Sequence, residues 1–72
     1  MTLADGADEL ARLHTRIARL HKDTAREFRK DVPDFMRVAV LAKEVAPLLR
    51  RSSELMHEIA EYLDGAQMAG TN

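Results

Sequence analysis

The 72-residue sequence has no cysteine, no tryptophan and only three aromatic residues, two phenylalanines and one tyrosine. Without cysteine, neither a disulfide nor a thiolate metal site can stabilise the fold. The longest unbroken apolar run, from Val38 to Ala42, is also short. It cannot form a membrane-spanning helix or the apolar segment of a signal peptide, so we expect a cytoplasmic protein that does not bind membranes.

The chain is short as well. A domain of this size buries only about 60% of the surface that its unfolded chain exposes, so its own core is marginally stable. Small domains that lack disulfides and metals often gain stability by association or by very regular helix packing. We therefore expect one small domain that associates with another molecule.

Charge of either sign is not in large excess. Eleven Lys and Arg residues nearly balance twelve Asp and Glu residues, which gives a net charge of −1. This balance argues against a general nucleic-acid-binding protein, because such proteins gain affinity by neutralising phosphates. The sequence also has no glycine-rich phosphate loop and no ordered Ser, His and Asp set. We expect neither catalysis nor a cofactor.

Hydrophobic periodicity in the first half predicts an amphipathic helix over about residues 4–31. Apolar positions recur at alternating spacings of three and four residues, which is the pattern of a coiled-coil seam. The residues of this seam are Leu10, Leu13, Ile17, Leu20 and Thr24. The helix should end by about residue 31, because Pro33 keeps the preceding Val32 out of the helical conformation.

The same periodicity resumes after a tight turn at residues 31–34 and predicts a second helix over about residues 34–64. Its apolar pattern starts at Phe35 and continues along a seam of Val38, Leu41, Val45, Leu48, Ser52, Leu55, Ile59 and Tyr62. Gly65 can adopt the left-handed conformation that often ends a helix, and residues 66–72 show no periodicity. We therefore expect a single domain, residues 1–65, followed by a flexible tail.

Pro47 lies inside the second helical segment. A proline there removes one backbone hydrogen bond and crowds the preceding turn, at a cost of about 3 kcal/mol. Because the apolar seam keeps its phase across Pro47, the pattern favours one helix that is kinked at this point. The alternative ends the helix near residue 50 and starts a third helix with Ser52 or Ser53 as its cap.

We label the heptad columns a to g, with Leu10, Ile17 and Thr24 at column a of the first helix and Val38, Val45, Ser52 and Ile59 at column a of the second. The apolar arc covers four of these seven columns, whereas packing against one neighbour needs only two. Beside the seam columns a and d, the first helix has His14, His21 and Phe28 at column e and Ala4, Ala11, Ala18 and Ala25 at column b. The second helix has Ala42, Leu49, Met56 and Leu63 at column e and Ala39, Ala46 and Ala60 at column b. Each helix should therefore contact two others.

This width predicts an all-α antiparallel helical hairpin that dimerises into a four-helix bundle. The alternative is a monomeric three-helix bundle that is broken at Pro47. The expected function is non-catalytic protein–protein interaction, as an adaptor, a docking module or an inhibitor. The expected partners are a second copy and another protein with a helical or basic surface. The expected interface residues are Leu10, Leu13, His14, Ile17, Leu20, His21, Phe28, Val45, Leu49, Met56, Ile59 and Leu63.

The charges suggest an orientation for such a dimer. In an antiparallel hairpin, the end opposite the turn collects acidic residues from both helices, whereas the turn is modestly basic. Opposite potentials orient association, so we expect two hairpins to pair head to tail. His14 and His21 lie within the apolar arc, where protonation would cost desolvation, so we expect association to weaken as the pH falls below about 6.5.

The sequence is also compatible with two other functions. Arg12, Arg16, Arg19 and Arg26 give the first helix a basic outer face, which is typical of a small helical nucleic-acid-binding regulator. Glu54 and His57 have the Glu-x-x-His spacing that some metal-binding bundles use. The heptad pattern directs this pair toward water rather than into the core, so it could bind a metal ion only between molecules.

Overall fold

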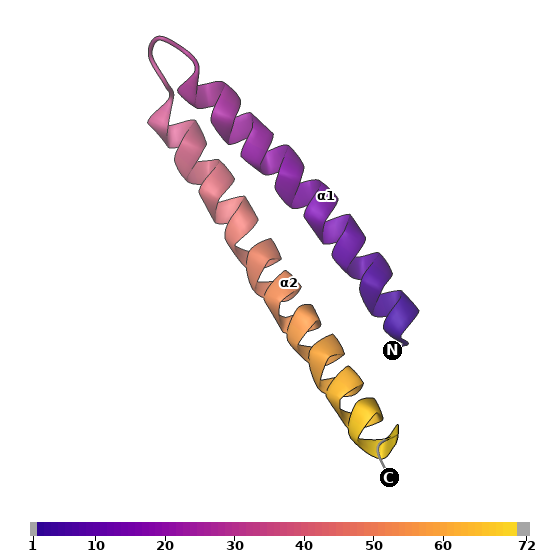
Figure 1. Cartoon of the computed structure of the whole chain (residues 1–72). Helices are drawn as coiled ribbons and strands as arrows, with labels where there is room; N and C mark the ends of the chain where they lie inside the picture. Colours follow the sequence, from indigo (N-terminus) through magenta and orange to yellow (C-terminus); the bar gives the residue numbers. More distant parts are fainter. Residues whose placement is uncertain (1, 71–72) are drawn as a thin grey trace.

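The computed structural model describes residues 2–70, and the side chains of residues 2–66. Two helices, α1 (Leu3–Phe28) and α2 (Phe35–Gly70), pack against each other as an antiparallel hairpin (Figure 1). The hairpin is a rod of 62 × 17 × 15 Å, and α2 extends past the start of α1 at the open end, opposite the turn. The predicted all-α helical hairpin is confirmed.

The first helix starts at a capping box. The hydroxyl of Thr2 accepts a hydrogen bond from the Asp5 N–H at 3.1 Å, and the Thr2 N–H donates to the Asp5 carboxylate at 3.4 Å. These two bonds satisfy amides that have no partner within the helix. The acidic side chain of Asp5 also suits the positive end of the helix dipole.

The turn begins earlier than the sequence indicates, since α1 ends at Phe28 rather than near residue 31. The carboxylate of Glu27 explains the difference, because it accepts a hydrogen bond from the Asp34 N–H at 2.8 Å and thereby closes the turn. Asp34 then caps α2 by accepting a hydrogen bond from the Arg37 N–H at 3.1 Å. The chain therefore reverses over residues 29–34.

The second helix is continuous through Pro47, so the alternative with a break and a third helix is wrong. Leu41 before Pro47 and Leu55 after it are both buried in the hairpin, and this packing offsets the lost backbone hydrogen bond. The predicted end at Gly65 is also wrong, because no described glycine has a positive φ and α2 continues to Gly70. Residues 66–70 include alanines and other good helix formers, while residues 71–72 of the predicted tail lie outside the described part.

The hydrophobic core is a single seam between the two helices. Leu41 and Leu55 of α2 are almost completely buried, and Leu10, Ile17 and Leu20 of α1 are buried against this helix. All five residues occupy columns a and d. The hairpin thus buries residues of the two seam columns, whereas the large apolar residues of the neighbouring column e are exposed.

Candidate association surface

The two flanks of the hairpin differ in chemistry. Glu9 of α1 and Arg51 of α2 both occupy column g, and their ion pair shows that the g columns of the two helices lie on the same side of the seam. Since column e lies across the seam from column g, the two e columns share the opposite side. We call these sides the polar flank and the apolar flank.

Arg51 organises the polar flank. Its Nε donates to Glu9 Oε2 at 2.9 Å and its Nη2 donates to Oε1 at 3.3 Å, while Glu54 and Glu58 lie within 4.0 Å. The hydrogen bonds from Arg51 lower the pKa of Glu9, and the same bonds raise the pKa of Arg51. This bidentate ion pair joins α1 to α2 near the open end.

The apolar flank consists of the e column of both helices. Its members are Ala7, His14, His21 and Phe28 on α1 and Phe35, Ala42, Leu49, Met56 and Leu63 on α2. Its five large apolar side chains are 46–69% exposed. They extend along the whole length of the hairpin, from the turn to the open end. A row of exposed large apolar side chains along one flank is typical of an association site.

The twelve residues predicted to form an interface divide into two groups. Six belong to the seam inside the hairpin and are buried or half-buried: Leu10, Leu13, Ile17, Leu20, Val45 and Ile59. The other six are exposed on the apolar flank: His14, His21, Phe28, Leu49, Met56 and Leu63. The second group is exposed to other molecules, and Phe35 joins it because it also occupies column e.

One histidine of the apolar flank links the two helices. His14 Nε2 lies 2.9 Å from the hydroxyl of Ser52, a residue that is buried in the seam. This contact satisfies a buried polar group, which would otherwise cost free energy. It also fixes the relative height of α1 and α2, because the two side chains meet directly across the hairpin.

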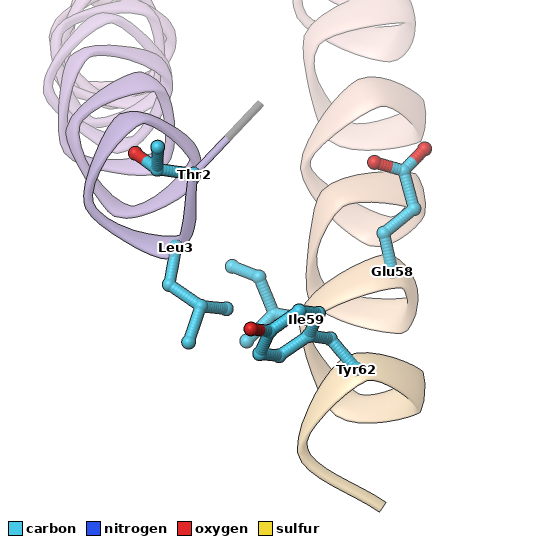
Figure 2. Close-up of a pocket in the computed structure, with 5 residues that line it drawn as sticks. All are labelled: Thr2, Leu3, Glu58, Ile59 and Tyr62. Atoms are coloured by element: carbon cyan, nitrogen blue, oxygen red, sulfur yellow. The ribbon is translucent and has the colours of Figure 1, made fainter. Parts of the chain in front are cut away.

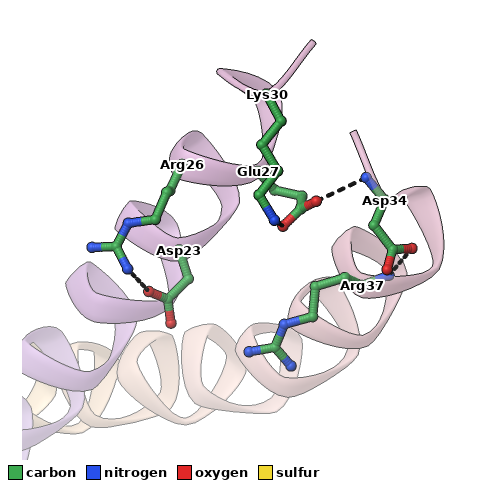
Figure 3. Close-up of polar contacts among 6 residues, drawn as sticks. All are labelled: Asp23, Arg26, Glu27, Lys30, Asp34 and Arg37. Carbon is green, nitrogen blue, oxygen red and sulfur yellow. Dashed lines mark hydrogen bonds and ion pairs between the residues drawn. The ribbon is translucent and has the colours of Figure 1, made fainter. Parts of the chain in front are cut away.

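The turn holds a second polar cluster (Figure 3). Glu27 is buried, and its carboxylate accepts hydrogen bonds from Lys30 Nζ at 2.9 Å and from the Asp34 N–H. The bond from Lys30, together with the bond from the Asp34 N–H, lowers the pKa of Glu27. Because Glu27 takes a seam position that apolar residues occupy elsewhere, the hydrophobic core ends at this residue.

A small hollow lies at the open end, where Leu3 approaches Ile59 and Tyr62 (Figure 2). It has a volume of about 190 Å³ and is completed by Thr2 and Glu58. Pockets that enclose small-molecule ligands usually measure about 300–1,000 Å³. The hollow is therefore smaller than an ordinary ligand site.

The four arginines of the predicted basic face, Arg12, Arg16, Arg19 and Arg26, are all exposed. Arg26 lies 3.9 Å from the carboxylate of Asp23. The structure thus exposes three of these side chains on the outer face of α1 and Arg16 on the polar flank.

Glu54 and His57 do not converge on a common point. Glu54 lies 3.6 Å from Arg51, while His57 Nε2 lies 3.0 Å from the Glu61 carboxylate. Within the described part of the chain, no three His, Asp or Glu side chains are close enough together to hold a metal ion.

Comparisons with protein-family models, with curated proteins and with solved structures find no match to this chain. Neither described helix combines the length and the apolar character that crossing a membrane requires. The candidate site is therefore defined by the geometry of the hairpin itself.

Proposed function

We propose that the protein is a non-catalytic association module that pairs with a second copy of itself through the apolar flank. One observation supports this proposal above all: five large apolar side chains lie on one flank of the hairpin, whereas the opposite flank is polar. Pairing of two such flanks converts two hairpins into a four-helix bundle. Self-association then serves to present the outer surfaces of two chains on one rigid body.

The energetics favour covering this flank. Burying a Leu, Met or Phe side chain completely contributes about 1.5–3 kcal/mol relative to full exposure. The large residues of the apolar flank are 46–69% exposed, so a partner can recover about half or more of this free energy at each position. A symmetric dimer gains these contributions twice, and the nearby alanines let the helices approach closely.

Substitution of Leu49 by Glu tests the proposal, and Val40 provides a matched control. Both side chains are 46% exposed, but Val40 occupies column c, away from the apolar flank. Leu49→Glu is expected to convert a dimer into a monomer, because it places a charge in the paired surface, whereas Val40→Glu is expected to stay dimeric. Sedimentation at micromolar concentration measures the mass, and circular dichroism verifies that each variant is helical.

Two results would overturn the proposal that the chain pairs with a second copy through the apolar flank. One is a wild-type chain that sediments as a monomer over the whole concentration range, in which case the flank is free for a helix of another protein. The other is equal dissociation of the dimer by Leu49→Glu and Val40→Glu. In that case the copies would meet through a different surface.

A further inference from the structure

We infer that the two copies pair head to tail about a two-fold axis that crosses the apolar flank at Leu49 of α2 and between His14 and His21 of α1. The turn of each copy then lies beside the open end of the other. This inference rests on the proposed association through the apolar flank and specifies its geometry. Its support comes from the heights, sizes and charges of the residues on the hairpin.

The two residue columns that form the apolar flank have their centres at the same height along the hairpin. The column on α2 has Leu49 at the centre, and the column on α1 is centred between His14 and His21. The contact between His14 and Ser52 places these two residues at the same height. Leu49 lies three residues from Ser52 toward the turn, and the centre of the α1 column lies about three residues from His14 in the same direction. Because both helices rise 1.5 Å per residue, the two centres lie at the same height. A two-fold axis that runs perpendicular to both helices can relate the two copies of each column only if the two columns have their centres at the same height.

The sizes of the side chains fit the same axis. Rotation about it lays each column against its own copy in reverse order, so that Leu49 meets Leu49 of the second copy. Phe28 then meets Ala7, and Met56 meets Ala42. Large side chains therefore face small ones at these two positions, which favours close packing. Phe35 faces Leu63 at the two ends of the flank and forms a purely apolar pair. His14 of one copy lies beside His21 of the other.

The charges favour the head-to-tail orientation over the head-to-head one. All eleven Lys and Arg residues lie within residues 11–53, whereas seven of the twelve carboxylates lie at the open end, in residues 5–9 and 54–64. A head-to-head dimer would bring two such sets of carboxylates together, and like charges repel. In the head-to-tail dimer, each set lies beside the other copy's turn, where Arg29 and Arg37 are exposed.

Single-cysteine variants test the orientation, because the natural chain has no cysteine to compete. Leu49→Cys places a thiol on the axis, so oxidation or a short bis-maleimide should join the two copies covalently. Arg50→Cys places a thiol one residue away on the outer face and should not cross-link. Asp31→Cys places it at the exposed turn, where the two copies are close only in a head-to-head dimer.

The expected result is efficient cross-linking of Leu49→Cys and little cross-linking of Arg50→Cys or Asp31→Cys. Cross-linking of Asp31→Cys but not of Leu49→Cys, in chains that sediment as dimers, would overturn the head-to-tail orientation and leave the proposed function intact. Monomeric behaviour of the wild-type chain and all variants would overturn both proposals.

The salt dependence of the wild-type dimer gives a second readout that needs no substitution. Between 0.1 M and 1 M salt, the Debye length falls from about 10 Å to about 3 Å, which screens contacts between exposed charges. The head-to-tail dimer should therefore dissociate more readily at high salt, with a dissociation constant that rises several-fold. A constant that falls with salt would contradict this orientation, because screening would then relieve repulsion.

Discussion

Two charged side chains, Glu27 and Arg51, hold the two ends of the hairpin. Glu27 binds the Asp34 N–H across the turn, and Arg51 binds Glu9 across the seam near the open end. Between these contacts, Leu41 and Leu55 are almost completely buried. Polar contacts thus join the two helices at each end of the hairpin, and apolar packing between these contacts supplies most of its stability.

Replacement of Leu55 by Ala should lower the free energy of unfolding by about 2–5 kcal/mol, because the side chain is fully buried and its removal leaves a cavity. Met36→Ala is a suitable control, since Met36 is 77% exposed and its truncation should change stability by less than about 0.5 kcal/mol. Urea unfolding at a fixed protein concentration measures both values. Equal effects of the two substitutions would show that Leu55 is not part of the core.

The lowered pKa values of Glu9 and Glu27 predict a loss of stability in acid. Both folded-state values lie below the ordinary value of 4.5. The stabilising effect of these carboxylates is therefore complete above pH 4.5 and disappears as the pH falls through the folded-state values. Glu27→Gln removes one of these titrations, so its melting temperature should fall less steeply than that of the wild type between pH 5 and pH 3, as circular dichroism can measure. Parallel curves for the two chains would contradict this prediction.

At the scale of the helices, hydrophobic periodicity was sufficient to predict where α1 and α2 lie and which columns form the seam. Helix ends depend on local hydrogen bonds that periodicity does not encode, as Glu27 shows at the turn. Glycine is also an ambiguous signal, because Gly65 can end a helix but here lies within one. At Pro47 the sequence favoured one kinked helix over two separate helices. The structure has one helix through this point, as the unbroken phase of the seam indicated, and the kink stays a prediction.

Replacement of Pro47 by Ala should stabilise the protein, by up to about 3 kcal/mol, because alanine restores a backbone hydrogen bond and removes the clash with the preceding turn. Urea unfolding of the variant and of the wild type, at one protein concentration, measures the gain. Lys43→Ala serves as a control at an exposed helical position without proline. No gain for Pro47→Ala would show that α2 accommodates the proline without cost at this point.

At the scale of the whole molecule, the four-column apolar arc predicted more surface than one hairpin can bury, and the structure divides it into a seam and an exposed flank. Pairing of that flank with a second copy stays a prediction. The contact between Glu9 and Arg51 was not predicted, although both residues occupy column g. Their register depends on the length of the turn, and the sequence pattern placed that turn too late.

The hydrogen bond from the Asp34 N–H to Glu27 also bears on how the chain can be extended or labelled. An insertion at the exposed turn would separate this donor from its acceptor, and the start of α2 would lose its contact with α1. This loop is therefore a poor site for an epitope or a reporter. The end of α2 is better suited, because it extends past the start of α1 and away from the turn. A reporter fused there would leave the turn unchanged and report on the intact hairpin.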